Sequence, residues 1–218
     1  MQNAVGFLSS TLGKKVLMAV TGIILVGFVI VHMAGNLQIY LGAEVLNKYG
    51  ELLHSNKAVL WGARAVLLFA VGVHIVAAVQ VWLRNRSARP VKYKVFRPPA
   101  VDYAARTMAW SGPIIAFFIV FHLLDLTVGT AHPDYIRGDV YHNVVTSFSQ
   151  PLVAGVYIVA NLLLAFHLYH GVWSLFQSMG WDHMRFGPLR RVAAVAIAVV
   201  VAAGNISIPL AVLTGVVS

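Results

Sequence analysis

The chain has 218 residues, of which 59% are hydrophobic and only 11% are charged, and its formal net charge is +9. Soluble domains carry about 25% charged residues, so this composition indicates a membrane protein. The sequence contains no cysteine, which excludes disulfides, thiolate metal ligands and an iron–sulfur cluster housed by the chain itself.

Five apolar segments predict an all-α membrane protein that forms a single transmembrane domain over residues 1–218. Each segment is close to the ~20 residues that span ~30 Å of hydrocarbon. The first follows Lys14 and Lys15 but is too long for a signal-peptide core and lacks a clear small-residue cleavage site, so we expect a retained helix. The expected spans are 15–35, 59–83, 107–129, 151–176 and 190–213.

The positive charges favour one orientation. Twelve Lys and Arg residues lie on one side of the predicted spans: Lys14 and Lys15, seven in the 84–106 connection, and Arg185, Arg190 and Arg191. Four lie on the other side: Lys48, Lys57, Arg64 and Arg137. The positive-inside rule predicts a multi-pass protein with a cytoplasmic N-terminus and, because there are five spans, an outer C-terminus. Topology explains the basic excess, and no nucleic-acid partner is expected.

Histidines recur inside the predicted spans. For any single one, the ordinary alternative is a neutral imidazole hydrogen-bonded between helices, but ionisable groups in a membrane usually face a functional interior. At about 1.5 Å per residue, His32 and His122 lie roughly 25 and 24 Å from the basic side, whereas His74 lies roughly 15 Å from it. His167 lies near the level of His74. We therefore expect two layers, each with two imidazoles.

Two facing pairs of imidazoles are what two bis-histidine hemes require. Zinc would need four clustered ligands, which the two layers do not provide. The His32–His74 and His122–His167 intervals, 42 and 45 residues, indicate a weak internal duplication, while the fifth span has no histidine. Glycines near these positions could admit a macrocycle or serve ordinary helix packing; they are Gly35, Gly72 and Gly171.

Several stretches resemble a known family. They are SSTLGKKVLMAVTG leading into HMAGNLQIYLG, YAARTMAWSGPI leading into FHLLDLTVG, and FHLYHGVWSLFQSMGW. Over nearly the whole chain the sequence resembles the diheme cytochrome b membrane anchor of succinate:quinone oxidoreductases, the five-helix type that includes some fumarate reductases. The resemblance implies two heme b groups, the distal one bound by His32 and His122 and the proximal one by His74 and His167.

The resemblance also implies a complex embedded in the lipid of the bacterial cytoplasmic (inner) membrane. A flavoprotein subunit would carry out the succinate chemistry, and an iron–sulfur subunit would exchange electrons with this chain. The 84–106 connection and the turn around 182–191 would form much of the docking surface. This chain would be the electron-transfer and quinone-reacting subunit, with no catalytic residue for succinate, and menaquinone is the usual substrate of such anchors.

Other side chains are secondary candidates. Glu51 and His54 are predicted to contribute to an outer quinone site, although solvated loop residues would look the same. Arg64 and Arg106 are candidate heme-propionate contacts or snorkelling cations. His170 either binds a propionate or packs beside Trp173, with His167 as the ligand. The remaining histidines, His132, His142 and His183, are expected in loops without a role.

Two alternative functions stay open. The chain could be a different diheme cytochrome b, such as the anchor of a formate dehydrogenase or hydrogenase, or a transmembrane ascorbate-reducing type. It could also be a small transporter or channel that uses its histidines as a proton relay and holds no pigment.

Overall fold

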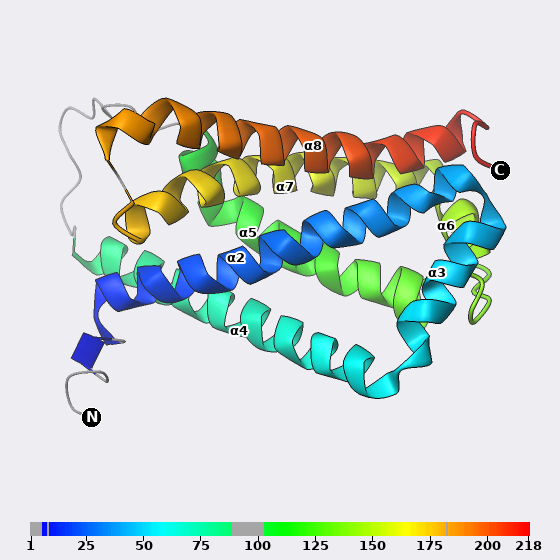
Figure 1. Cartoon of the computed structure of the whole chain (residues 1–218), viewed down its shortest axis with the longest axis horizontal. Helices are drawn as coiled ribbons and strands as arrows, with labels where there is room; N and C mark the ends of the chain where they lie inside the picture. The colour runs from blue at the N-terminus through cyan, green and yellow to red at the C-terminus, as the bar shows by residue number, and fades with distance from the viewer. Residues whose placement is uncertain (1–5, 8, 89–102, 182) are drawn as a thin grey trace.

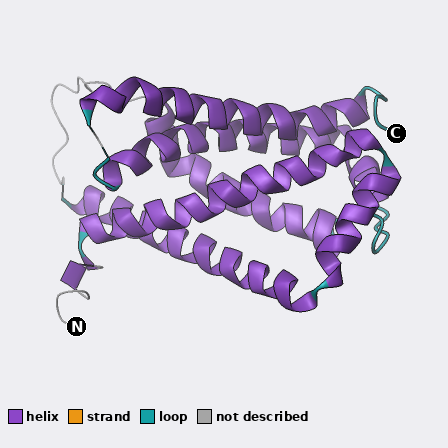
Figure 2. Cartoon of the chain, in the orientation of Figure 1, coloured by secondary structure: helices purple, strands orange, loops and turns teal. Residues whose placement is uncertain are grey.

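The computed structural model describes residues 6–7, 9–88, 103–181 and 183–218, with only the backbone at 103–106. The described chain is helical, without a β-strand (Figure 2). Five helices are long and apolar enough to cross a membrane, which confirms the predicted fold class. They are α2 (Thr11–Asn36), α4 (Lys57–Ser87), α5 (Tyr103–Leu123), α7 (Pro151–Ser178) and α8 (Gly187–Leu213).

α2 and α4 begin a few residues before the predicted apolar segments, and a polar residue caps the start of each. The side chain of Ser10 accepts a hydrogen bond from the Gly13 amide at the start of α2. Asn56 accepts from two backbone amides at the start of α4. Such caps satisfy the first N–H groups of a helix. Short 3₁₀ and π segments continue α2 and α5; they are η1 (Leu37–Leu41) and η2 (Leu124–Val128).

Two short helices connect the spans at one end of the bundle, α3 (Ala43–Ser55) and α6 (Val140–Phe148). The prediction that His142 lies in a loop is therefore wrong, since it lies in the first turn of α6. Asp139 caps α6 by accepting from the His142 amide and the Asn47 side chain. These bonds hold the pKa of Asp139 below its usual range. The stability that they contribute is lost as the pH falls and the carboxylate is protonated.

The helices pack unequally (Figure 1). α7 packs against α8 and α5, while α2 packs against α4 and α7. Both α7 and α8 bury small side chains, which allow two helix backbones to approach closely in a membrane; these include Ala154, Ala160, Ala194 and Ala198. α4 contacts α2 extensively and α3 only slightly, and Figure 1 shows α2 and α4 diverging toward α3.

The two ends of the bundle differ in charge. One end, here called the basic end, carries Lys14, Lys15, Arg84, Arg86, Arg185, Arg190 and Arg191. The opposite end carries α3 and α6 and is called the α3–α6 end. Figure 1 shows the start of α2 at the first and the end of α8 at the second. The Asp and Glu residues that the structure describes all lie toward the α3–α6 end. Five successive spans place the start of the first span and the end of the last at opposite ends of the bundle.

Gly129 ends η2 with a φ of 85°, in the left-handed region, and a Cβ there would collide with the Tyr135 ring. We expect Gly129→Ala to destabilise the protein by about 1–2 kcal/mol from the backbone alone, with further loss from displacing Tyr135. The measurement is the thermal unfolding midpoint in detergent. Gly62→Ala is the control, because that α4 glycine has open space around it and alanine favours a helix. Equal midpoints for the two variants would contradict the prediction.

Candidate functional site

Four histidines from four spanning helices form two ring pairs. His32 on α2 and His122 on α5 have ring centroids 5.8 Å apart, with ring planes at 84°. His74 on α4 and His167 on α7 have centroids 6.3 Å apart, with planes at 56°. The structure thus brings together the same histidines that the depth estimate paired.

The pairs lie at different levels of the bundle. Thr21 on α2 contacts the His74 ring, with 3.1 Å between Oγ1 and Nδ1. His32 follows Thr21 by eleven residues on the same helix, which corresponds to about 16 Å along its axis. The His74–His167 pair is therefore nearer the basic end, and the His32–His122 pair is nearer the α3–α6 end.

Each pair joins two helices that otherwise hardly touch. Within the described part of the chain, α2 has at most marginal backbone proximity to α5, and α4 has at most marginal proximity to α7. The α2–α4 and α5–α7 neighbours pack extensively by comparison. The histidine rings consequently face one another between helices that are held apart.

The spacing of the rings suits a metal ion between them. Because imidazole nitrogens bind metal ions at about 2.0–2.1 Å, two imidazoles on opposite sides of one ion have ring centroids roughly 6 Å apart. The observed separations, 5.8 and 6.3 Å, match this value. No group of three or more His, Asp or Glu side chains with metal-binding geometry occurs among the described residues. Each pair therefore offers two imidazoles, the number of protein ligands that a bis-histidine heme uses.

Hydrogen bonding fixes the tautomer of His74. The Thr21 hydroxyl donates its proton to the Leu17 carbonyl oxygen at 2.7 Å, so its contact with His74 Nδ1 must have the ring as donor. Nδ1 then carries the proton, and Nε2 keeps the lone pair that can bind a metal. Metal-binding histidines are usually oriented by a partner of this kind.

A longer chain of bonds fixes His122 in the same way. The Tyr157 hydroxyl donates to Asp125 Oδ2 at 2.8 Å, so it accepts from Nδ1 of His122, which lies 3.3 Å from it. Nε2 of His122 again keeps its lone pair. Asp125 also accepts a hydrogen bond from Ser147 at 2.7 Å.

The other two histidines have different surroundings. His167 Nδ1 is buried and has no hydrogen-bond partner among the described residues, a costly arrangement unless a further group satisfies the ring. His32 Nε2 lies 3.2 Å from Asn36 Nδ2, so binding a metal through Nε2 requires the Asn36 amide to move. The Phe28 ring stacks on the His32 ring, with centroids 5.2 Å apart.

The secondary candidates have the following positions. His170 contacts Ser174 on its own helix, with 3.0 Å between Nε2 and Oγ, whereas the His167 ring faces His74. The Arg64 guanidinium lies over the Trp61 ring, 5.0 Å from its centroid. The side chain of Arg106 lies outside the described residues, as does most of the predicted docking connection.

Glu51 and His54 lie on α3, and both are exposed. His54 Nδ1 donates to the Gly50 carbonyl oxygen of its own helix at 2.7 Å. They share the α3–α6 end with the His32–His122 pair, as predicted, but no contact joins them to either ring of that pair among the interactions described. Their role at a quinone site stays a prediction.

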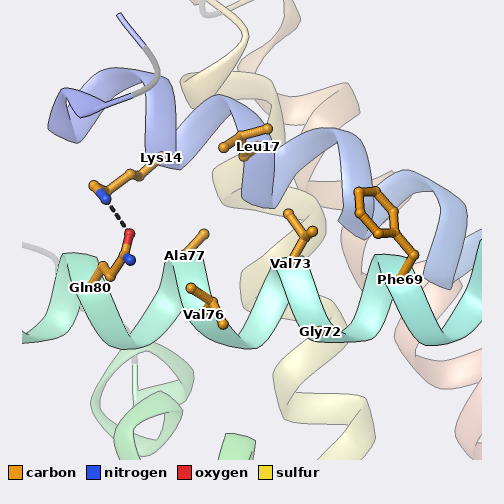
Figure 3. Close-up of a pocket in the computed structure, with 8 residues that line it drawn as sticks. All are labelled: Lys14, Leu17, Phe69, Gly72, Val73, Val76, Ala77 and Gln80. Carbon is orange, nitrogen blue, oxygen red and sulfur yellow. Dashed lines mark hydrogen bonds between the residues drawn. The ribbon is translucent and has the colours of Figure 1, made fainter. Parts of the chain in front are cut away.

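A pocket of about 360 Å³ lies between α2 and α4 toward the basic end. Figure 3 shows Lys14 and Gln80 pointing toward each other across it, and a hydrogen bond joins the two side chains. The rest of the lining is apolar: Leu17, Phe69, Gly72, Val73, Val76 and Ala77. This pocket was not predicted from the sequence.

The three glycines expected near the rings have different roles. A Cβ at Gly35 would lie 2.6 Å from the Tyr49 ring, so this glycine accommodates Tyr49. Gly72 and Gly171 have no atom within 4 Å of the place where a Cβ would be. Only the last two have open space beside them.

Sequence reasoning missed the residues that orient the imidazoles, namely Thr21, Asp125 and Tyr157. One signal was present: Asp125 falls within the predicted span 107–129, and an acid inside a span usually has a function. The partnership of Tyr157 and Asp125 depends on how α5 and α7 pack, which no local pattern reveals.

Comparison with known proteins finds no matching family model, no similar curated protein and no similar solved structure. The functional assignment therefore depends on the residues of this chain and their geometry.

If the His74–His167 pair binds a heme, as the sequence predicts, Thr21→Val should weaken that binding, because it removes the hydroxyl that accepts the Nδ1 proton. Loss of such a partner lowers metal affinity by about 10–100-fold. The measurement is the heme retained by the purified protein and its visible spectrum. Thr21→Ser keeps the hydroxyl and should retain the heme; equal heme loss in both variants would contradict the assigned bond.

Proposed function

We propose that the chain is the membrane-anchor cytochrome b subunit of a succinate:quinone oxidoreductase. It would carry electrons between an iron–sulfur subunit and membrane quinone through two heme b groups, each bound by two histidines. The observation that supports the proposal is the geometry of the imidazoles: two pairs, at two depths, spaced for one ion each, between helices that do not otherwise pack.

The residues of this chain have defined tasks in this proposal. His32 and His122 hold one heme, and His74 and His167 hold the other. Thr21 and Tyr157 each accept the Nδ1 proton of their histidine partner, so that the Nε2 lone pair of that histidine can bind iron. Heme would supply one-electron redox chemistry when bound, and two imidazole ligands would leave no position on its iron open to oxygen.

The arrangement of the two pairs fits transfer across the membrane. The His74–His167 pair would receive electrons from, or return them to, an iron–sulfur subunit docked at the basic end. The His32–His122 pair would exchange them with quinone, menaquinone being the expected type, near the α3–α6 end. The basic end would face the cytoplasm of a bacterial cell under the positive-inside rule.

The assignment to succinate chemistry depends on the sequence resemblance. Stretches such as FHLYHGVWSLFQSMGW favour this family over the diheme anchors of formate dehydrogenases or hydrogenases. A proton-relaying transporter would use the same intramembrane histidines but would need no macrocycle between them. The presence of heme and the identity of the copurifying subunits therefore distinguish the three functions.

The complex purified through this subunit should contain two b-type hemes per copy of the chain, because the structure provides two separate donor pairs. Pyridine hemochrome analysis measures the number. Flavin and succinate-dependent heme reduction should copurify with it. A colourless protein would contradict heme binding, and copurified molybdenum or nickel without flavin would replace the succinate assignment with the formate dehydrogenase or hydrogenase type.

Glu51→Gln and His54→Ala together should slow electron transfer to quinone, while heme reduction by succinate continues, because both residues are proposed to act at the quinone end. Steady-state quinone reduction and inhibitor sensitivity are the measurements. Glu44→Gln is the matched control: Glu44 lies on the same short helix, exposed and paired with Lys48. Unchanged turnover and inhibition in the double variant would remove Glu51 and His54 from the quinone site.

A further inference from the structure

A buried carboxylate lies close to one histidine pair. Asp125 is 1% exposed and belongs to the π-helical turn η2, which directly follows the α5 turn that carries His122. Acids inside a membrane-spanning segment are costly and usually functional. Single π turns inside helices also occur frequently at functional sites. The heme-binding role proposed above gives His122 a task but leaves Asp125 without one.

The carboxylate is connected to His122 through one hydroxyl. Asp125 Oδ2 accepts from Tyr157, and the Tyr157 oxygen accepts from His122 Nδ1. Ser147 on α6 donates to the same carboxylate oxygen from the other side. The network thereby joins three helical elements to one ring nitrogen.

The aromatic surroundings of Tyr157 fix its hydroxyl in place. Its ring packs edge-on against Phe118, Phe121 and Phe148, with centroid distances of 5.0, 6.0 and 4.7 Å. The Tyr157 side chain is buried, and the backbone carbonyl of this residue accepts a hydrogen bond from the Asn161 side-chain amide. A ring held on several sides presents its hydroxyl to both Asp125 and His122 without further ordering cost.

We propose that Asp125, acting through Tyr157, is a positioning residue that sets the redox potential of the heme at the His32–His122 pair. The inference rests on the proposed function, because it concerns a heme bound there. A carboxylate that accepts the tyrosine proton makes the tyrosine oxygen a better acceptor for the imidazole N–H. Such a partner raises the basicity of the ligand and so favours oxidised iron. The midpoint potential of this heme is therefore lower than it would be without the relay.

The second pair provides an internal comparison. His74 donates to the Thr21 hydroxyl, which passes its proton to a neutral backbone carbonyl instead of a carboxylate. Asp125 variants should therefore change the His32–His122 component and leave the His74–His167 component unchanged.

The test is a redox titration of the two heme components in the intact complex. Tyr157→Phe keeps the packed ring and removes the hydroxyl; it should raise the midpoint potential of the component that His32→Ala abolishes. Asp125→Asn should raise the same potential. Ser147→Ala is the matched control, because it removes a donor to Asp125 but leaves the path to His122 in place, and it should cause no rise.

A double variant separates the relay from a simple through-space charge. If Asp125 acts through Tyr157, Asp125→Asn should shift the potential much less in the Tyr157→Phe background than in the wild type. An equal shift in both backgrounds, or no rise in Tyr157→Phe with both hemes retained, would overturn the proposal. Two hemes and an unchanged second component show that a variant has folded. Absence of heme from the wild-type complex would instead refute the proposed function.

Discussion

A polar side chain inside hydrocarbon must find a partner, and this requirement governs the centre of the molecule. His74 and His122 meet it through Thr21 and Tyr157, and the four imidazoles face one another in pairs across helices that have little other contact. If α2 packed directly on α5, or α4 on α7, apolar side chains would take the place of the facing imidazoles. The bundle is instead stabilised elsewhere, where small residues let α7 and α8 approach closely.

The orientation of the rings depends on a further layer of polar residues. Thr21 and Tyr157 each give away their own proton and accept one from a histidine, which leaves the other ring nitrogen available. His167 has no such partner among the described residues, and His32 is contacted by Asn36. The two pairs are therefore alike in their imidazoles but unlike in the residues that contact them.

Much of this arrangement was predictable from the sequence. The rest depends on how the helices pack, which local sequence patterns do not reveal. Long apolar segments indicate spans because hydrocarbon thickness fixes their length, and a constant rise per residue places His32 and His74 at different depths. Helix α3 was missed because its polar residues resemble a solvated loop. The Asp125–Tyr157 bond was missed because it joins residues 32 positions apart, a contact that only the packing of α5 and α7 determines.

The central claim is that each facing pair binds one heme, and single histidine variants test it most directly. Heme content and low-spin spectra should be recorded for His32→Ala, His122→Ala, His74→Ala and His167→Ala, with His170→Ala as the control that retains both hemes. The account predicts that the first two variants lose one and the same spectral component, and that the next two lose the other. Loss of the same component in His32→Ala and His74→Ala would contradict it.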